Sequence, residues 1–125
     1  MTKRILVVED QEDNRRILRD MLRKAGFDVL EATTGEQGVL LAKTQMPDLI
    51  LMDIQMPVLD GYEATRRIKN ILELKDIPII VVTSYALSGE DAKAQSAGAA
   101  AYVSKPFSPR QLLAKIRQFF PALSE

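Results

Sequence analysis

Three carboxylates directly follow two short apolar runs of the chain, and their spacing is suited to chemistry. Glu9 and Asp10 come after the run Ile5–Val8, and Asp53 comes after Leu49–Met52. Short runs of this kind are typical of buried strands. Because negative charges held close together repel one another, three acids at two strand ends indicate a divalent cation.

Magnesium is the cation that suits these acids. It prefers oxygen ligands, keeps several waters and accepts one or two carboxylates together with phosphate oxygens. Asp10 and Asp53 are candidates for direct ligands, and Glu9 is a candidate for a ligand that acts through water. A single acid at a strand end is more often a cap of the next helix. Three acids on one edge, beside a Lys and a Thr, favour the metal site.

Three further residues at predicted strand ends suit a phosphoryl group carried on a carboxylate. Lys105 supplies an ammonium, Thr83 a hydroxyl, and Ser84 a small side chain that lets a backbone N–H approach an anion. Taken singly, Lys105 also fits a solvated surface Lys, and Thr83 also fits a β-branched residue that ends a strand. Together with Asp53, whose carboxylate is a competent nucleophile, they predict phosphoryl transfer to this chain.

The sequence contains no motif for a bound nucleotide. It has neither GxxxxGK[ST] nor GxGxxG, so the phosphoryl group has to arrive from a partner protein or a small donor. The absence of His removes the commonest general base and the usual zinc ligand. The absence of Cys removes disulfides and thiolate chemistry.

Length and composition predict one domain over residues 1–125, with a well-filled core from 46% hydrophobic residues. Lys+Arg and Asp+Glu both number 17, and this balance argues against nucleic acid as the main partner. No apolar stretch is long enough to span a membrane, and the first one is too short for a signal peptide. We therefore expect a cytoplasmic protein that binds no nucleic acid, membrane or nucleotide.

Short apolar runs alternate with amphipathic segments along the chain. A strand followed by a helix, repeated five times, predicts an α/β fold with a doubly wound, five-stranded parallel sheet and helices on both faces. Ligands of such sheets bind beyond the carboxyl ends of the strands, where the acids, Thr83 and Lys105 would lie. The predicted strands are Ile5–Val8, Val29–Ala32, Leu49–Met52, Ile79–Val82 and Ala100–Val103.

Capping signals predict where the five helices begin and end. Gly26 should end the first helix and Ser88 should cap the fourth. The second, third and fifth helices should open on the pairs Thr34 with Gln37, Asp60 with Glu63, and Ser108 with Gln111. The side chains expected to face the core are Ile17, Leu18, Met21, Leu22 and Ala25, then Ala64, Ile68 and Leu72, then Leu112, Leu113, Ile116, Phe119 and Phe120.

The joint pattern resembles the CheY-like receiver domain of two-component response regulators over nearly the whole chain. The residues that carry the resemblance are Glu9-Asp10, Asp53, Met56–Gly61, Thr83-Ser84 and Lys105-Pro106-Phe107. It implies the strand order 2-1-3-4-5 and an Asp53 that accepts a phosphoryl group from a histidine kinase or a histidine phosphotransfer protein. It also implies Mg²⁺ on Glu9, Asp10, Asp53 and the backbone carbonyl of Gln55. Thr83 and Lys105 would hold the phosphoryl group, and the Lys105–Pro106 bond is commonly cis in the family.

The same resemblance implies a switch that changes the affinity for a downstream protein. The positions of Thr83 and Tyr102 form this switch in the family, and the fourth helix, fifth strand and fifth helix form the output face. The position of Tyr102 equally fits an aromatic side chain that only packs at the edge of the sheet and takes no part in a switch. Tyr85 suggests slow dephosphorylation. The end of the chain soon after the fifth helix favours a free-standing regulator, while the loop Met56–Arg67 also resembles receivers attached to hybrid sensor kinases.

Two other classes of function fit part of the pattern. A haloacid-dehalogenase-type phosphatase also uses a strand-end Asp nucleophile, magnesium, a Thr or Ser and a Lys. It needs a second Asp two residues after the nucleophile, and this chain has Gln55 there. An interaction protein that ignores phosphate would not require the acids, Thr83 and Lys105 together. The sequence thus favours a phosphoacceptor switch over an enzyme, with self-dephosphorylation as its only catalysis.

Overall fold

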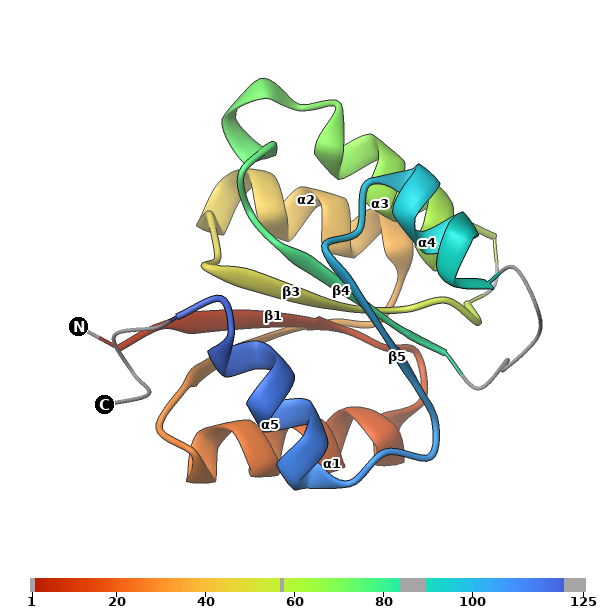
Figure 1. The fold of residues 1–125 in the computed structure, drawn as a ribbon. Coiled ribbons are helices and arrows are strands. Elements are labelled where there is room, and N and C mark those ends of the chain that lie inside the picture. Colours follow the sequence, from red (N-terminus) through yellow and green to blue (C-terminus); the bar gives the residue numbers. More distant parts are fainter. Residues whose placement is uncertain (1, 57, 84–89, 121–125) are drawn as a thin grey trace.

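The computed structural model describes residues 2–56, 58–83 and 90–120, which form a five-stranded parallel sheet with helices on both faces (Figure 1). The strands are β1 (Arg4–Val8), β2 (Asp28–Ala32), β3 (Leu49–Asp53), β4 (Ile79–Thr83) and β5 (Ala101–Ser104). The helices are α1 (Glu12–Lys24), α2 (Gly35–Gln45), α3 (Gly61–Lys69), α4 (Glu90–Ala97) and α5 (Pro109–Arg117), and a 3₁₀ helix, η1 (Leu72–Leu74), precedes β4.

The strand order β2-β1-β3-β4-β5, with every pair parallel, confirms the predicted fold class. Residues of β3 and β4 are buried throughout, as expected for apolar runs covered on both faces, whereas the edge strands β2 and β5 are partly exposed. The predicted strand limits are short by one residue at the start of β1 and β2 and at the end of β3, β4 and β5, and the fifth predicted strand begins one residue early. Asp53 and Thr83 are the last residues of β3 and β4, so the sheet itself fixes their backbones.

Two helical layers enclose the sheet, with α1 and α5 on one face and α2, α3 and α4 on the other (Figure 1). The α1–α5 side holds an apolar cluster that includes Ile5, Val7, Leu18, Leu22, Leu49, Leu51, Ile80, Leu112, Ile116 and Phe120. The opposite side holds a second cluster that includes Leu6, Val8, Ile50, Met52, Leu59, Ala64, Ile68, Leu74 and Ile79. The carboxyl ends of the central strands emerge between these layers.

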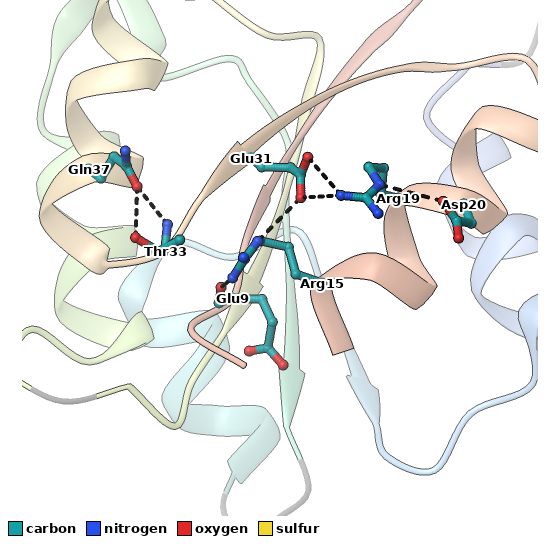
Figure 2. A network of polar contacts seen from close by, with 7 residues as sticks. All are labelled: Glu9, Arg15, Arg19, Asp20, Glu31, Thr33 and Gln37. Carbon is teal, nitrogen blue, oxygen red and sulfur yellow. Dashed lines mark hydrogen bonds and ion pairs between the residues drawn. The ribbon is translucent and has the colours of Figure 1, made fainter. Parts of the chain in front are cut away.

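The capping predictions that fall on described residues agree with the structure, with one change of partner. Gly26 has a φ of 96°, a left-handed conformation that favours Gly after a helix end. The Asp60 carboxylate accepts the Glu63 N–H at 2.9 Å, and Ser108 with Gln111 form a complete capping box. The Thr34 hydroxyl caps α2, but the Gln37 side chain accepts its bonds from Thr33 instead (Figure 2).

Two apolar positions expected to face the core are exposed. Leu72 lies 72% exposed in η1, because α3 ends at Lys69 and the tighter 3₁₀ turn brings Leu74 inward in its place. Ile17 is 58% exposed, because the buried stripe of α1 runs through Leu18 and Leu22 and leaves Ile17 at its margin. Both predictions assumed that apolar residues at a regular helical spacing are buried. At these two positions the packing of the folded chain buries a neighbouring residue instead.

Several sequence predictions fall on residues outside the described ranges: the anion-facing Ser84, the bulky Tyr85 and the cap Ser88. Among the described helices, none combines the length and the apolar character that crossing a lipid bilayer requires.

Candidate functional site

The ends of β1 and β3 bring three carboxylates into one cluster. Val8 lies beside Met52 in the sheet, so the residues that follow each of them emerge together. Glu9, Asp10 and Asp53 each place one oxygen within 4.8 Å of the others. Glu9 is 1% exposed and Asp53 is 6% exposed, so at least two of the charges are removed from bulk water. Three acids this close favour either a cation or a proton.

Burial and neighbouring charge act in the same direction on Glu9. Desolvation raises the pKa of this carboxyl to about 8, and the nearby Asp53 carboxylate adds to the rise. The Lys105 ammonium opposes the rise only in part. Burial and the neighbouring Asp53 carboxylate therefore both favour the protonated form of Glu9 when no cation is bound.

Lys105 lies opposite the acids. Its Nζ is 3.5 Å from Glu9 Oε1 and 3.5 Å from Asp53 Oδ1, which makes both ion pairs loose. The backbone holds it there, since the Lys105 N–H donates to the Thr83 carbonyl at 2.6 Å. The peptide bond to Pro106 is cis, as is common in the family that the sequence resembles. Thr83 itself is fully buried at the end of β4.

The loop after β3 lies against the acceptor strand. The Gln55 N–H donates a long bond of 3.4 Å to Asp53 Oδ1, while Gln55 as a whole is exposed to solvent. Gly61 opens α3 directly over the backbone, and a Cβ there would lie 2.2 Å from the Asp53 carbonyl oxygen. Only a glycine permits this approach, so α3 is seated against the end of β3 and fixes the loop.

Tyr102 lies on β5 beside Val81 of β4 and is half-buried. It packs against a small apolar cluster of Ile54, Val81 and Ala94. Thr83 and Tyr102 are therefore on adjacent strands, and Tyr102 contacts the side of the sheet that α4 covers. This placement is compatible with both interpretations of the aromatic residue.

Sequence reasoning missed three residues next to the acids. The Arg15 guanidinium donates to the Glu9 backbone carbonyl at 3.0 Å and to Glu31 Oε1 at 3.2 Å (Figure 2). Asn14 also lies near the Glu9 side chain and favours its charged form. No local signal could have identified the Arg15–Glu31 pair, because 16 positions separate the two residues.

A hollow of about 330 Å³ borders Lys105 on the α1 side. Its lining is mostly apolar, and the exposed Ile17 is part of it. The lining residues are Asn14, Ile17, Leu18, Lys105, Pro106 and Phe107.

The acidic cluster fits a magnesium ion. Its donors are carboxylate oxygens, which hard cations prefer. Within the described residues, both Glu9 oxygens and Asp10 Oδ1 are buried and accept no hydrogen bond of good geometry. Buried carboxylate oxygens with so few donors are costly, since the only ion pair that these oxygens make among the described residues is the loose one from Lys105 to Glu9 Oε1, and a cation would supply the missing positive charge.

Comparison with known families agrees with this geometry. Residues 5–117 match the family of the response regulator receiver domain. The chain belongs to this family. Its members are phosphoacceptor switches of two-component signalling, which confirms the resemblance seen in the sequence. The same match supports a switch rather than a haloacid-dehalogenase-type phosphatase.

Both curated and solved relatives are similar along their whole length. The polar-differentiation response regulator DivK of Brucella ovis is 38% identical over 119 residues, which span 95% of this chain and 97% of the relative. The receiver domain of the sensor histidine kinase PA1611 from Pseudomonas aeruginosa is 36% identical, with a TM-score of 0.89 over all of both chains. That structure has a magnesium ion coordinated in its active site cleft.

A receiver domain from Methanospirillum hungatei is 30% identical, with a TM-score of 0.90 over 99% of this chain and 98% of its own. These relatives include a response regulator and a receiver from a sensor kinase, which correspond to the two arrangements considered from the sequence. They show the family and the fold.

Proposed function

We propose that Asp53 accepts a phosphoryl group from the phosphohistidine of a histidine kinase or a histidine phosphotransfer protein. The observation that carries this proposal is the setting of Asp53 at the end of β3. The Lys105 ammonium lies 3.5 Å away, and Glu9 and Asp10 complete a cluster in which all three acids approach within 4.8 Å. An aspartate in this setting is a nucleophile beside an ammonium that compensates incoming negative charge, and the neighbouring acids would hold a cation that adds to this compensation.

Each residue of the site has a proposed task in this transfer. Glu9, Asp10, Asp53 and the Gln55 carbonyl would hold Mg²⁺, which supplies positive charge to the phosphoryl oxygens when bound. Lys105 already lies near Asp53 and would exchange its loose pairs with the carboxylates for a contact with a phosphoryl oxygen. The Thr83 hydroxyl would donate to another oxygen of the same group.

The output of the switch would be a change of affinity for a downstream protein on the α4-β5-α5 face. Thr83 and Tyr102 link that face to the site, since they lie on the adjacent strands β4 and β5. A hydroxyl drawn toward phosphate leaves room in which Tyr102 can turn inward. This is a two-state element biased by a new charge at one end.

Beryllofluoride, a mimic of the phosphoryl group, should change amide hydrogen exchange mainly in α4 and β5. Ala94 and Ala97 are the buried apolar side chains of α4 among those described, so little apolar area holds this helix in place. Exchange mass spectrometry with and without the mimic measures the effect. Changes concentrated in α1 and α2 would move the output to another face.

Labelling stoichiometry tests the switch against the phosphatase. Purified protein incubated with acetyl phosphate and Mg²⁺ should take up one acid-labile phosphoryl group per chain, as measured by intact-mass spectrometry. A phosphatase would instead turn over p-nitrophenyl phosphate for many cycles. We expect no such turnover, because Gln55 stands where that mechanism needs a second Asp. Sustained turnover would overturn the proposed function.

The domain bounds, the cellular location and the partners of the protein are part of the same proposal. We place one receiver domain, residues 1–125, in the cytoplasm, where the ATP that charges histidine kinases is available. Its partners would be the phosphodonor and a downstream protein, rather than nucleic acid, a membrane or a nucleotide.

A further inference from the structure

The Arg15 side chain joins the end of β1 to β2 from its position on α1. Its Nη1 donates to the Glu9 carbonyl at 3.0 Å, and its Nε donates to Glu31 Oε1 at 3.2 Å (Figure 2). The side chain is 16% exposed, so it is well shielded from solvent. Arg19 also donates to both Glu31 oxygens, at 3.3 and 3.4 Å, and thereby holds Glu31 in place.

These contacts fix the backbone of Glu9 on both sides. The Glu9 N–H donates to the Ala32 carbonyl at the end of β2, at 3.0 Å, and the Glu9 carbonyl accepts from Arg15. The second contact orients the peptide plane that joins Glu9 to Asp10. The N-cap residue of α1, Gln11, makes no side-chain capping bond, so no side-chain cap duplicates the Arg15 contact there.

We propose that Arg15 is a positioning residue for the metal, acting through the Glu9 carbonyl to aim Glu9 and Asp10 at the cation. The inference rests on the proposed function of the acidic cluster and extends it. Arg15 has its ionic contact with Glu31, away from the metal-binding carboxylates, so it orients these ligands without competing for them. Groups that orient metal ligands in this way typically contribute tenfold or more to metal affinity.

Positioning and charge make opposite predictions for the loss of Arg15. A cationic side chain close to a cation site repels the metal, so its removal by charge alone would tighten Mg²⁺ binding. If Arg15 acts by positioning, its removal frees the Glu9–Asp10 peptide and weakens binding. The sign of the change therefore separates the two roles.

The experiment compares Arg15→Met with Arg19→Met, which removes the same charge from the same helix and also breaks a contact with Glu31. The hydrogen bonds of Arg19 go to Asp20 and Glu31 rather than to Glu9, which makes it the matched control. We expect Arg15→Met to bind Mg²⁺ about tenfold more weakly than wild type. Arg19→Met should stay within roughly twofold, since a solvent-accessible ion pair contributes little.

Magnesium titrations followed by ¹⁵N–¹H NMR measure these affinities, and ¹⁵N relaxation of the metal-free proteins supplies a readout that needs no metal. The Asp10 amide should become more mobile in Arg15→Met and not in Arg19→Met. At saturating Mg²⁺, acetyl phosphate should label Arg15→Met to the wild-type extent, because the loss lies in affinity rather than in the acceptor.

Equal or tighter Mg²⁺ binding in Arg15→Met, relative to Arg19→Met, would overturn the positioning role. If Arg15→Met does not fold, Arg15→Lys provides the same test, because a single ammonium cannot reproduce the two-sided contact of a guanidinium. Unchanged affinity in Arg15→Lys would then overturn the inference. A wild-type protein with no Mg²⁺ response would instead refute the proposed metal site itself, and this outcome is distinct from equal affinities among the variants.

Discussion

Asp53→Asn should abolish the incorporation of phosphate from acetyl phosphate or from a cognate kinase. The carboxamide has nearly the same shape as the carboxylate but lacks its charge and its nucleophilic oxygen, so the chemistry fails while the packing is kept. Because Asp53 is the last residue of the buried strand β3, a change of similar volume should leave the fold intact. Intact-mass spectrometry and circular dichroism check the two parts of this expectation.

The matched control for this variant is Asp60→Asn. Asp60 lies on the same loop, is exposed and caps α3 through the Glu63 N–H. Asn caps helices as well as Asp does, so this variant should label normally. Acid-labile phosphate that persists on Asp53→Asn would mean that another carboxylate is the acceptor.

Magnesium affinity should fall steeply as the pH drops below about 8, the raised pKa of Glu9. Below that pKa the metal has to displace a proton from the cluster, because a neutral carboxyl is a poor ligand. A proton competing with the metal weakens binding by up to tenfold per pH unit, so we expect affinity roughly 50-fold lower at pH 6 than at pH 8. Mg²⁺ titrations followed by NMR at several pH values measure this change in affinity.

Glu9→Gln is the control for the pH dependence, since it removes the titrating group and keeps the shape. Its Mg²⁺ affinity should vary much less between pH 6 and pH 8. An equally steep profile in this variant would assign the proton to another group of the cluster.

The stability of the metal-free protein should also depend on the protonation of Glu9. Since the pKa of Glu9 is about 8 in the folded protein and 4.5 when the side chain is freely solvated, the folded form binds more protons between these values. The free energy of unfolding contributed by this group is fully present below pH 4.5 and is lost as the pH rises through 8. Urea unfolding with and without Mg²⁺ should show the metal restoring stability at high pH.

The order of strands and helices could be predicted from the sequence because its causes are local. Apolar runs such as Ile79–Val82 are long enough for a buried strand, and Ser108 with Gln111 satisfy the first N–H groups of α5 through contacts three residues apart. Parallel strands then place their carboxyl ends on one edge. That rule sufficed to bring Glu9, Asp10 and Asp53 together.

The failures of local reasoning share a different cause. Leu72 continues a helical spacing, but α3 ends at Lys69 and the 3₁₀ turn inverts which side chain faces the core. Ile17 fits an apolar stripe, yet it borders the hollow beside Lys105. In both cases the packing of distant elements decides which of several apolar residues is covered.

By itself, the sequence determined the fold class and the types of residue at the site, since strand periodicity, helix caps and acid placement all depend on near neighbours. Only the tertiary structure decided the electrostatics and the support of that site. The burial of Glu9, the loose pairs of Lys105 and the bond from Arg15 to the Glu9 carbonyl each join separate elements of the fold. Desolvation and hydrogen-bond geometry depend on distances in space, and these distances exist only once β1, β2, β3 and α1 have packed together.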